Sequence, residues 1–180
     1  MTARLRLGMM ASAVLVAANL GVSANQATKA GEARIEREVR RELVTLPYYS
    51  LFDHLTFRVE GYKVTLGGKV SRPTLKSEAE NVVKRIEGVE KVENQIVVLP
   101  VSPNDDRLRL ALYRAIYGHN ALETLAVRAL PPIHIIVENG NVTLEGVVGT
   151  VLEKTVAGTQ ANTVPGTFSV TNNLRVESKS

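Results

Sequence analysis

The sequence contains one twelve-residue phrase twice. Residues 59–70 read VEGYKVTLGGKV, and residues 137–148 read VENGNVTLEGVV. The two segments align at an offset of 78 residues, and the register continues without a gap as far as Val98 and Val176. A repeat this long exceeds the unit of a solenoid, so the sequence predicts two copies of one small domain.

Each copy opens with an expected helix. Apolar residues recur at every fourth position, which is the spacing of one helix face. They are Ile35, Val39 and Leu43 in the first copy, and Leu108, Leu112 and Ile116 in the second. The second of these helices follows residues 102–106, which read SPNDD. We expect the polar side chains of this segment, from Ser102 to Asp106, to cap the helix, and a cation site at Asp105 and Asp106 is the alternative.

A β-hairpin, a second helix and a last strand complete each copy. Gly61–Tyr62 and Asn139–Gly140 are expected to form the two-residue turns of the hairpins. The last strands, residues 91–98 and 168–176, should run parallel to the second hairpin strand because such crossovers are right-handed. The predicted fold class is therefore α+β: two tandem αββαβ domains, each a three-stranded mixed sheet with two helices on one face.

Four recurring glycines are predicted to be structural. Gly68 and Gly146 fall on the apolar face of the sheet, where a missing Cβ would let the second helix approach closely. Gly88 and Gly166 follow the second helix, where a left-handed residue is needed to end it. In the second copy, residues 158–165 include poor helix formers, so its second helix is expected to be short or frayed.

The N-terminal residues resemble a secretion signal. Arg4 and Arg6 precede an apolar run at residues 7–22, and small residues then favour cleavage after Ala24. The alternative is an uncleaved anchor, although the run is shorter than the ~20 residues needed to span a membrane. The expected organisation is a signal peptide at 1–24, a first domain at 25–100 and a second domain at 101–180, in an exported, periplasmic protein with possible membrane association.

Composition narrows the function classes. The chain has no Cys, so it can form no disulfide, thiolate metal site or cysteine nucleophile. Residues 25–100 carry thirteen Lys and Arg against eleven Asp and Glu, and residues 101–180 carry seven of each class. A nucleic-acid partner requires a clustered basic face. The charge pattern therefore predicts no nucleic-acid partner.

No catalytic site is expected. His54, His119 and His134 lack the spacing of metal ligands, and we interpret them as structural or solvent-facing residues. Ser50, Asp53 and His54 are close in sequence, but no nucleophile elbow accompanies them. The sequence therefore predicts a protein that is not an enzyme and that uses no metal or cofactor.

Five residues are the candidates for binding a membrane or partner. They are Tyr48, Tyr49, Tyr113, Arg114 and Tyr117. The first two belong to residues 46–53 (LPYYSLFD), whose aromatic side chains either cover the core or contact a membrane interface or partner. The other three lie within about one turn of an expected helix. They are expected to form an aromatic patch for lipid contact, with a place in the core as the alternative.

Two further features are expected to be structural. Residues 121–130 (ALETLAVRAL) predict a short extra helix in the second copy, with leucines that pack on the core or between the domains. Asn94 and Asn172 fall on the inward face of the last strand. We interpret each as a buried amide that binds neighbouring backbone, with ligand binding as the alternative.

The order of elements and four phrases resemble the BON domain, the bacterial OsmY and nodulation domain. The phrases are VTLGGKV, VTLEGVV, GVEKVENQIVV and GTFSVTNNLRV. The resemblance implies an exported, OsmY-type protein with two tandem domains and no catalytic motif. The implied function is non-enzymatic binding of phospholipid or envelope partners, in envelope maintenance or osmotic stress. The alternative is a periplasmic chaperone-like or structural protein that engages client chains by strand addition.

Overall fold

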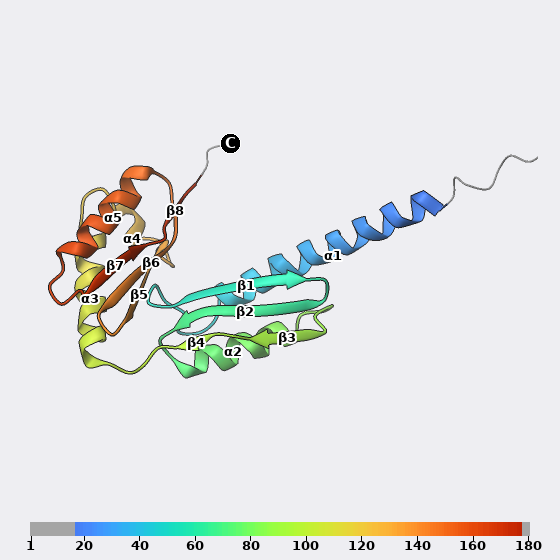
Figure 1. Cartoon of the computed structure of the whole chain (residues 1–180), viewed down its shortest axis with the longest axis horizontal. Coiled ribbons are helices and arrows are strands. Elements are labelled where there is room, and N and C mark those ends of the chain that lie inside the picture. The colour runs from blue at the N-terminus through green and yellow to red at the C-terminus, as the bar shows by residue number, and fades with distance from the viewer. Residues whose placement is uncertain (1–16, 178–180) are drawn as a thin grey trace, which may run out of the picture.

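The computed structural model describes residues 17–177, with side chains from residue 29 onward. Residues 1–16, the greater part of the expected signal peptide, lie outside the described residues. The remaining elements form two lobes (Figure 1). The first contains α1 (Ala17–Val44), β1 (His54–Glu60), β2 (Lys63–Val70), α2 (Pro73–Lys84), β3 (Lys91–Asn94) and β4 (Val97–Val98). The second contains α3 (Pro103–Tyr117), α4 (Glu123–Ala126), β5 (Ile133–Glu138), β6 (Asn141–Val148), α5 (Val151–Thr163), β7 (Ser169–Asn172) and β8 (Arg175–Val176).

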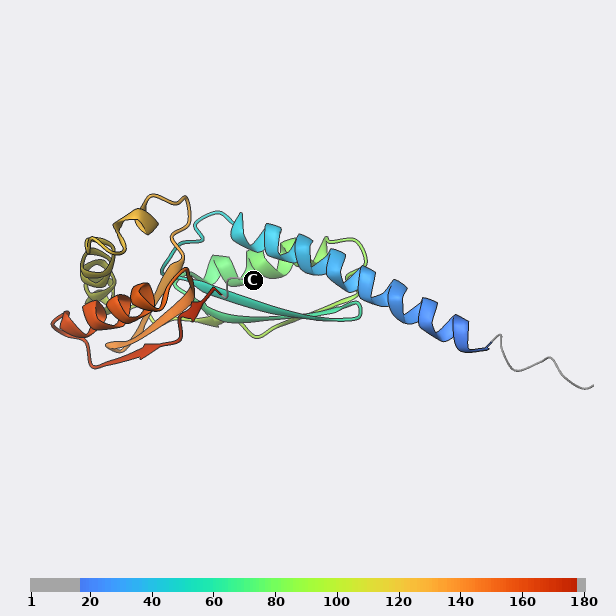
Figure 2. The ribbon, with the colours of Figure 1, turned by 90° about the horizontal axis from the view of Figure 1, so that it is seen from above.

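The strand pairing confirms the predicted fold class in both lobes. β1 and β2 are antiparallel, with Val59 opposite Val64, and β2 is parallel to β3 and β4. The second lobe repeats the pattern, with Val137 opposite Val142 and β6 parallel to β7 and β8. Figure 2 shows α1 and α2 on the same side of the first sheet. Each lobe therefore has one helix-covered sheet face and its own apolar core.

Each expected last strand is divided into two short strands by an asparagine. Asn94 Nδ2 donates to Lys76 O at 2.9 Å, and its Oδ1 accepts from Ile96 N at 3.1 Å. Asn172 repeats both bonds, to Lys154 O at 2.8 Å and from Leu174 N at 3.2 Å. The amides hold the second helix to the strand, and they satisfy the backbone where the strand is interrupted. This confirms the structural interpretation of both asparagines.

Gly68 and Gly146 are structural for a different reason from the one expected. They have positive φ values of 101° and 127°. A Cβ on Gly68 would lie 2.0 Å from His54 O, and a Cβ on Gly146 would lie 2.0 Å from Pro132 O. The close neighbour is therefore the backbone of the adjacent strand or its lead-in, and the expected approach of a helix is wrong. Gly88 and Gly166 have φ values of 87° and 91° in the turns after α2 and α5, which agrees with their expected left-handed conformation.

The second helix of the second lobe is not short. α5 has 13 residues against 12 in α2, which corrects the expectation of a frayed helix. A capping box between Thr150 and Glu153 satisfies its first backbone N–H groups. Gly158 packs closely on the last strand, since a Cβ there would lie 2.7 Å from Asn172 Nδ2, at the end of that side chain. Packing against the sheet thus outweighs the low helix propensity of this segment.

The extra segment of the second lobe forms the short helix α4, as predicted. Leu122 and Leu125 are buried in the second core. At the other end of the chain, α1 extends well beyond the predicted apolar stripe and has 28 residues. Within the described part of the chain, no helix combines the length and apolar character needed to cross a membrane.

The loop between α1 and β1 joins the two lobes. Leu51 and Phe52 pack against the core of the second lobe, and Leu51 O accepts a hydrogen bond from Ile135 N at 2.7 Å. The carboxylate of buried Asp53 orders this loop by accepting hydrogen bonds from the hydroxyl groups of Ser50 and Ser71, at 2.8 and 2.7 Å. Residues 46–53, for which an exposed aromatic loop was one expectation, therefore lie partly between the domains.

Candidate functional site

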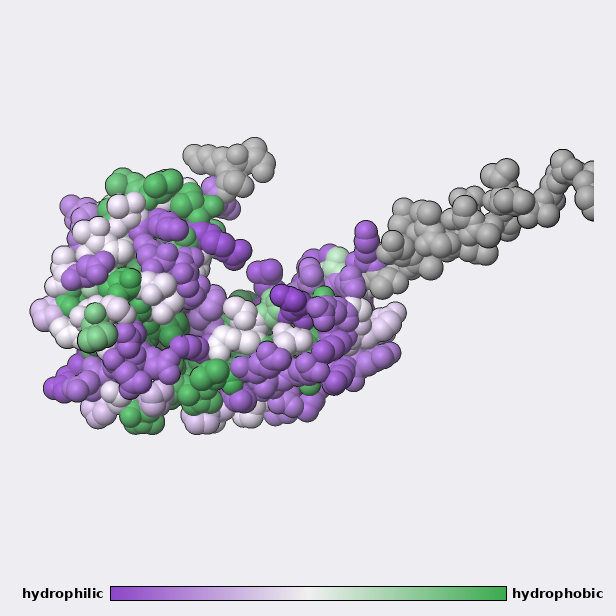
Figure 3. All heavy atoms as spheres, in the orientation of Figure 1, coloured by the Kyte–Doolittle hydropathy of each residue, from purple (hydrophilic) through white to green (hydrophobic). Residues whose placement is uncertain are grey.

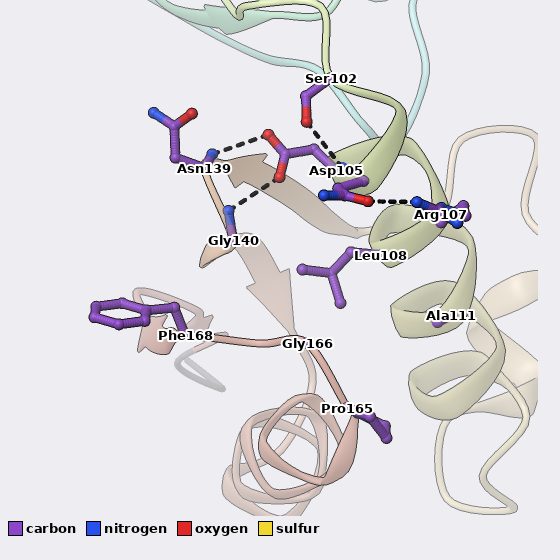
Figure 4. Close-up of a pocket in the computed structure, with 11 residues that line it drawn as sticks. Ser102, Asp105, Arg107, Leu108, Ala111, Asn139, Gly140, Pro165, Gly166 and Phe168 are labelled. Atoms are coloured by element: carbon purple, nitrogen blue, oxygen red, sulfur yellow. Dashed lines mark hydrogen bonds between the residues drawn. The ribbon is translucent and has the colours of Figure 1, made fainter.

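A groove on the second domain is a candidate binding site that belongs to one domain. It has a volume of about 720 Å³ and lies between the first half of α3, the β5–β6 turn and the loop after α5 (Figure 4). The lining residues that Figure 4 labels are Ser102, Asp105, Arg107, Leu108, Ala111, Asn139, Gly140, Pro165, Gly166 and Phe168. The groove therefore has a polar end at the hairpin turn and an apolar side along α3 and the loop after α5.

The polar end is built around one buried carboxylate. Asp105 is 2% exposed, and its two carboxylate oxygens accept from Asn139 N at 2.9 Å and Gly140 N at 3.0 Å. The N-cap of α3 is Ser102, whose Oγ accepts from Asp105 N at 3.2 Å. The capping expectation is therefore confirmed for Ser102 and corrected for Asp105. Its carboxylate ties the hairpin turn to α3, and the described residues contain no group of three side chains that could hold a metal ion.

The first domain uses the same device. Glu32 Oε1 accepts from Gly61 N at 2.7 Å, so an acidic side chain of α1 holds the first hairpin turn. Glu32 precedes Ile35 by three residues, as Asp105 precedes Leu108. The repeated pairing indicates a structural role for both carboxylates, and it leaves the apolar side of the groove as the part available to a partner.

An exposed face of α3 borders the groove, and Arg107 and Ala111 belong to both. Arg107, Leu110, Ala111 and Arg114 stand at positions i, i+3, i+4 and i+7, which share one helix face. Leu110 is 50% exposed, and Phe168, on the loop that forms the opposite wall, is 85% exposed. In the view of Figure 3, apolar side chains gather over the second domain, whereas hydrophilic side chains cover most of the first. We call Leu110, Phe168 and the two arginines the α3 surface.

The α3 surface differs from the aromatic patch expected on this helix. Tyr117 is only 4% exposed, and its hydroxyl donates to Ile133 O at 2.8 Å and accepts from Ile133 N at 2.9 Å. Burial raises the pKa of the Tyr117 phenol far above its ordinary value. Tyr113 is half-buried against the same core, with its ring centroid 5.3 Å from that of Tyr117. Arg114 is exposed, so it alone of the three expected residues belongs to the α3 surface.

Tyr48 and Tyr49 lie apart from this surface. Tyr48 is 69% exposed and has a positive φ of 67°, with the guanidinium of Arg72 5.0 Å from its ring centroid. Tyr49 is half-buried, its hydroxyl accepts from Leu55 N at 3.4 Å, and its ring centroid is 5.8 Å from that of His134. Burial raises the pKa of the Tyr49 phenol. Tyr49 is therefore part of the junction between the domains.

Sequence reasoning missed Leu110 and Phe168. Leu110 departs from the apolar stripe of its helix, and an apolar residue outside the stripe is the available signal for an exposed anchor. The sequence pattern places Phe168 in the last strand, but β7 begins one residue later, at Ser169. The loop after α5 therefore presents this ring to solvent.

The fold defines a class of protein: tandem α+β modules in which two helices cover one face of a small mixed sheet. The family comparison agrees with the resemblance seen in the sequence. The BON domain model matches residues 31–100 and 105–178, and the chain belongs to the BON domain family. BON domains are generally non-catalytic binding domains, typically of periplasmic or envelope-associated proteins.

Other comparisons add little. No curated protein matches the chain. Among solved structures, CdsD, a structural protein of the type III secretion system of Chlamydia trachomatis, matches with 14% identity and a TM-score of 0.29 over 78% of this chain and 91% of that one. The C-terminal domain of CdsD matches with 14% identity and a TM-score of 0.28 over 79% of this chain and 96% of that one. Scores this low carry no argument about fold or function.

Proposed function

We propose that this protein is a non-enzymatic envelope protein whose second domain binds phospholipid through the α3 surface, in envelope maintenance or osmotic stress. The observation that carries the proposal is the exposure of two large apolar side chains. Leu110 shares a helix face with Arg107 and Arg114, and Phe168 lies on the loop across the groove from α3. Apolar side chains enter the membrane interface, while arginines on the same face meet anionic headgroups.

The strength of this binding follows from its few anchors. Complete burial of a Leu or Phe side chain is worth about 1.5–3 kcal/mol, and partial insertion of these two contributes less. Each arginine near an anionic surface adds about 1 kcal/mol. Arg114 has no ion-pair partner within 4.0 Å among the described residues, so its charge is available to a headgroup. We expect weak, reversible binding with a modest salt dependence, because only two charges contribute.

Strand addition of client chains, the alternative function, has less support. A client would pair with an exposed sheet edge. On β5 that edge is already engaged by the first domain, because Ile135 N donates to Leu51 O. The opposite edges are formed by strands of only four and two residues. The seven-residue strand β1 is the longest sheet edge left for a client, and it belongs to the first domain. We therefore place the binding activity on the α3 surface.

The test compares two pairs of substitutions in vesicle flotation. Leu110→Ser with Phe168→Ser removes the two anchors, whereas Tyr62→Ser with Val97→Ser removes two comparably exposed side chains, 52% and 48%, from the first domain. With vesicles of phosphatidylcholine and phosphatidylglycerol, the first pair should lower the bound fraction at least fivefold, and the second should leave it unchanged. Circular dichroism should show both variants folded.

Three results would contradict the proposal. The first is that the wild-type protein fails to float with the vesicles. The second is that both pairs of substitutions lower the bound fraction equally, and the third is that neither pair lowers it. The last result would place membrane contact in another segment, such as the N-terminal apolar run, since both variants retain that segment.

A further inference from the structure

The junction between the two domains contains a second hollow, separate from the α3 surface. It has a volume of about 630 Å³, within the ~300–1,000 Å³ range of small-molecule sites. α1, β1 and the loop between them form one wall. The other wall comes from the loop after α4, the start of β5 and the β6–β8 end of the second sheet. Figure 3 shows the surface hollowed between the two lobes. We call this hollow the junction cleft, and neither domain forms it alone.

Three arginines from three different elements line the junction cleft. Arg40 lies on α1, Arg128 follows α4, and Arg175 is on β8. Within the described residues, none of the three has a carboxylate within ion-pairing distance, although many other basic side chains of the protein do. Arginines that converge from separate elements without acidic partners are suited to a bound carboxylate or phosphate, which guanidinium groups bind by paired hydrogen bonds.

Arg40 is positioned by a group inside the cleft. The Arg40 guanidinium carbon is 5.6 Å from the centroid of the Phe57 ring, which holds the charge over an aromatic face. His54 also lines the cleft, and burial lowers the pKa of its imidazole. The charges of Glu145 and Arg175 have smaller and opposite effects on that pKa. Arginines from the first and second domains therefore line the same cleft.

The floor of the cleft is aromatic and uncharged at neutral pH. The rings of Tyr49 and His134 lie in contact, with centroids 5.8 Å apart and planes tilted by 34°, and His134 is only 8% exposed. His134 Nδ1 donates to Asp53 O at 2.5 Å, which fixes the ring. Burial lowers the pKa of His134, so the imidazole is neutral at pH 7. The junction cleft thus combines arginine side chains with an uncharged aromatic floor.

Two glutamates, Glu36 and Glu177, also line the cleft. They leave three arginines against two carboxylates, so a long polyanion would gain little from the site. A ligand with one anionic group and a flat apolar body matches the lining better, because the anion can meet the arginines while the body contacts the aromatic floor.

We propose that the junction cleft binds a small organic anion, a phosphate or carboxylate carried on an aromatic or apolar body, held by Arg40, Arg128 and Arg175. Such a ligand contacts both domains, so its binding also stabilises their docked arrangement. This site is independent of the α3 surface.

Titration calorimetry with phenyl phosphate tests the site in the full-length protein. Benzyl alcohol, which lacks the charge, and inorganic phosphate, which lacks the ring, should each bind at least tenfold more weakly. Arg40→Gln and Arg175→Gln, one from each domain, should each weaken phenyl phosphate binding at least fivefold. The matched control is Arg85→Gln, an exposed arginine at the end of α2 outside the cleft, which should change the affinity less than twofold.

The proposal is overturned if phenyl phosphate releases no heat at millimolar concentration, or if Arg85→Gln weakens binding as much as the cleft substitutions. Both cleft arginines are exposed, and circular dichroism checks that the variants fold. Vesicle flotation distinguishes a free organic anion from a lipid headgroup as the ligand of the cleft. Arg40→Gln with Arg175→Gln should leave vesicle flotation unchanged, and a loss of flotation without phenyl phosphate binding would assign the cleft to a headgroup and overturn the small-molecule ligand.

Discussion

Replacement of Gly68 by alanine should destabilise the first domain through a collision inside its sheet. The added Cβ would lie 2.0 Å from His54 O, 3.0 Å from His54 C and 3.1 Å from the Cα of Leu55. All three atoms belong to the backbone of β1, so a side-chain rotation cannot relieve the contact. In addition, the φ of 101° is one that residues with a Cβ rarely adopt.

The magnitude follows from these two effects. A residue held in a sparsely populated backbone region costs about 1–3 kcal/mol. Separation of β1 from β2 at this point weakens one or two ladder hydrogen bonds, each worth about 0.5–1.5 kcal/mol. Alanine gives the unfolded chain less conformational entropy than glycine does, and this offsets about 0.4–1 kcal/mol of the lost stability. We therefore expect the free energy of unfolding to fall by about 2–4 kcal/mol.

Gly61→Ala is the matched control in the same sheet. Gly61 also has a positive φ, 61°, but it lies in the left-handed helical region, and a Cβ added there would meet no heavy atom within 4 Å. The left-handed conformation costs alanine about 1–2 kcal/mol of folding free energy. The lower conformational entropy of alanine in the unfolded chain offsets part of this cost. Urea unfolding at pH 7.5, followed by circular dichroism, measures both variants. Equal midpoints for the two, or a wild-type midpoint for Gly68→Ala, would refute the strand-collision account.

Three further predictions concern buried polar groups. Tyr117→Phe leaves the N–H and C=O of Ile133 without their partner, and should lower the free energy of unfolding by about 1–3 kcal/mol in a urea titration; an unchanged midpoint would contradict this. Asn172→Leu removes the bond to Lys154 O and should cost about 1–2 kcal/mol, with increased hydrogen exchange in β7 as the diagnostic result. His134 has a lowered pKa through burial, so the unfolded state binds its proton first as pH falls below about 6.5. Stability should therefore decrease from pH 7.5 to pH 5.5, less so in His134→Gln, and an identical pH dependence in the variant would exclude this histidine as the cause.

The internal repeat was sufficient to predict the fold. Hairpin turns, helix stripes and the parallel last strand depend on local propensities and on hydrophobic periodicity, which are readable residue by residue. The paired Val59 and Val64 confirm the predicted register of the first hairpin. The asparagines of the last strand were also interpreted correctly, because an amide at an inward position must find a partner.

The binding residues were harder to predict because exposure depends on neighbours that are distant in sequence. Tyr117 is one turn from Tyr113, yet the start of β5 covers its hydroxyl. Phe168 follows a helix whose length the local propensities underestimated, and the loop after α5 turns the ring outward. Periodicity identifies which side of a helix is apolar, but it does not identify which other segment packs over a given turn.

The repeat, the αββαβ order and the positions that require glycine can be read from the amino-acid sequence. The reason why Gly68 is required becomes visible only in the folded chain, as do the joining of the domains by residues 46–53 and the cleft that both domains line beside them. The physical reason is the range of the interactions. Backbone conformation and side-chain alternation are set by adjacent residues, whereas the carbonyl of His54, the N–H of Ile135 and the arginines of the cleft meet their neighbours only when segments far apart in the chain are packed together.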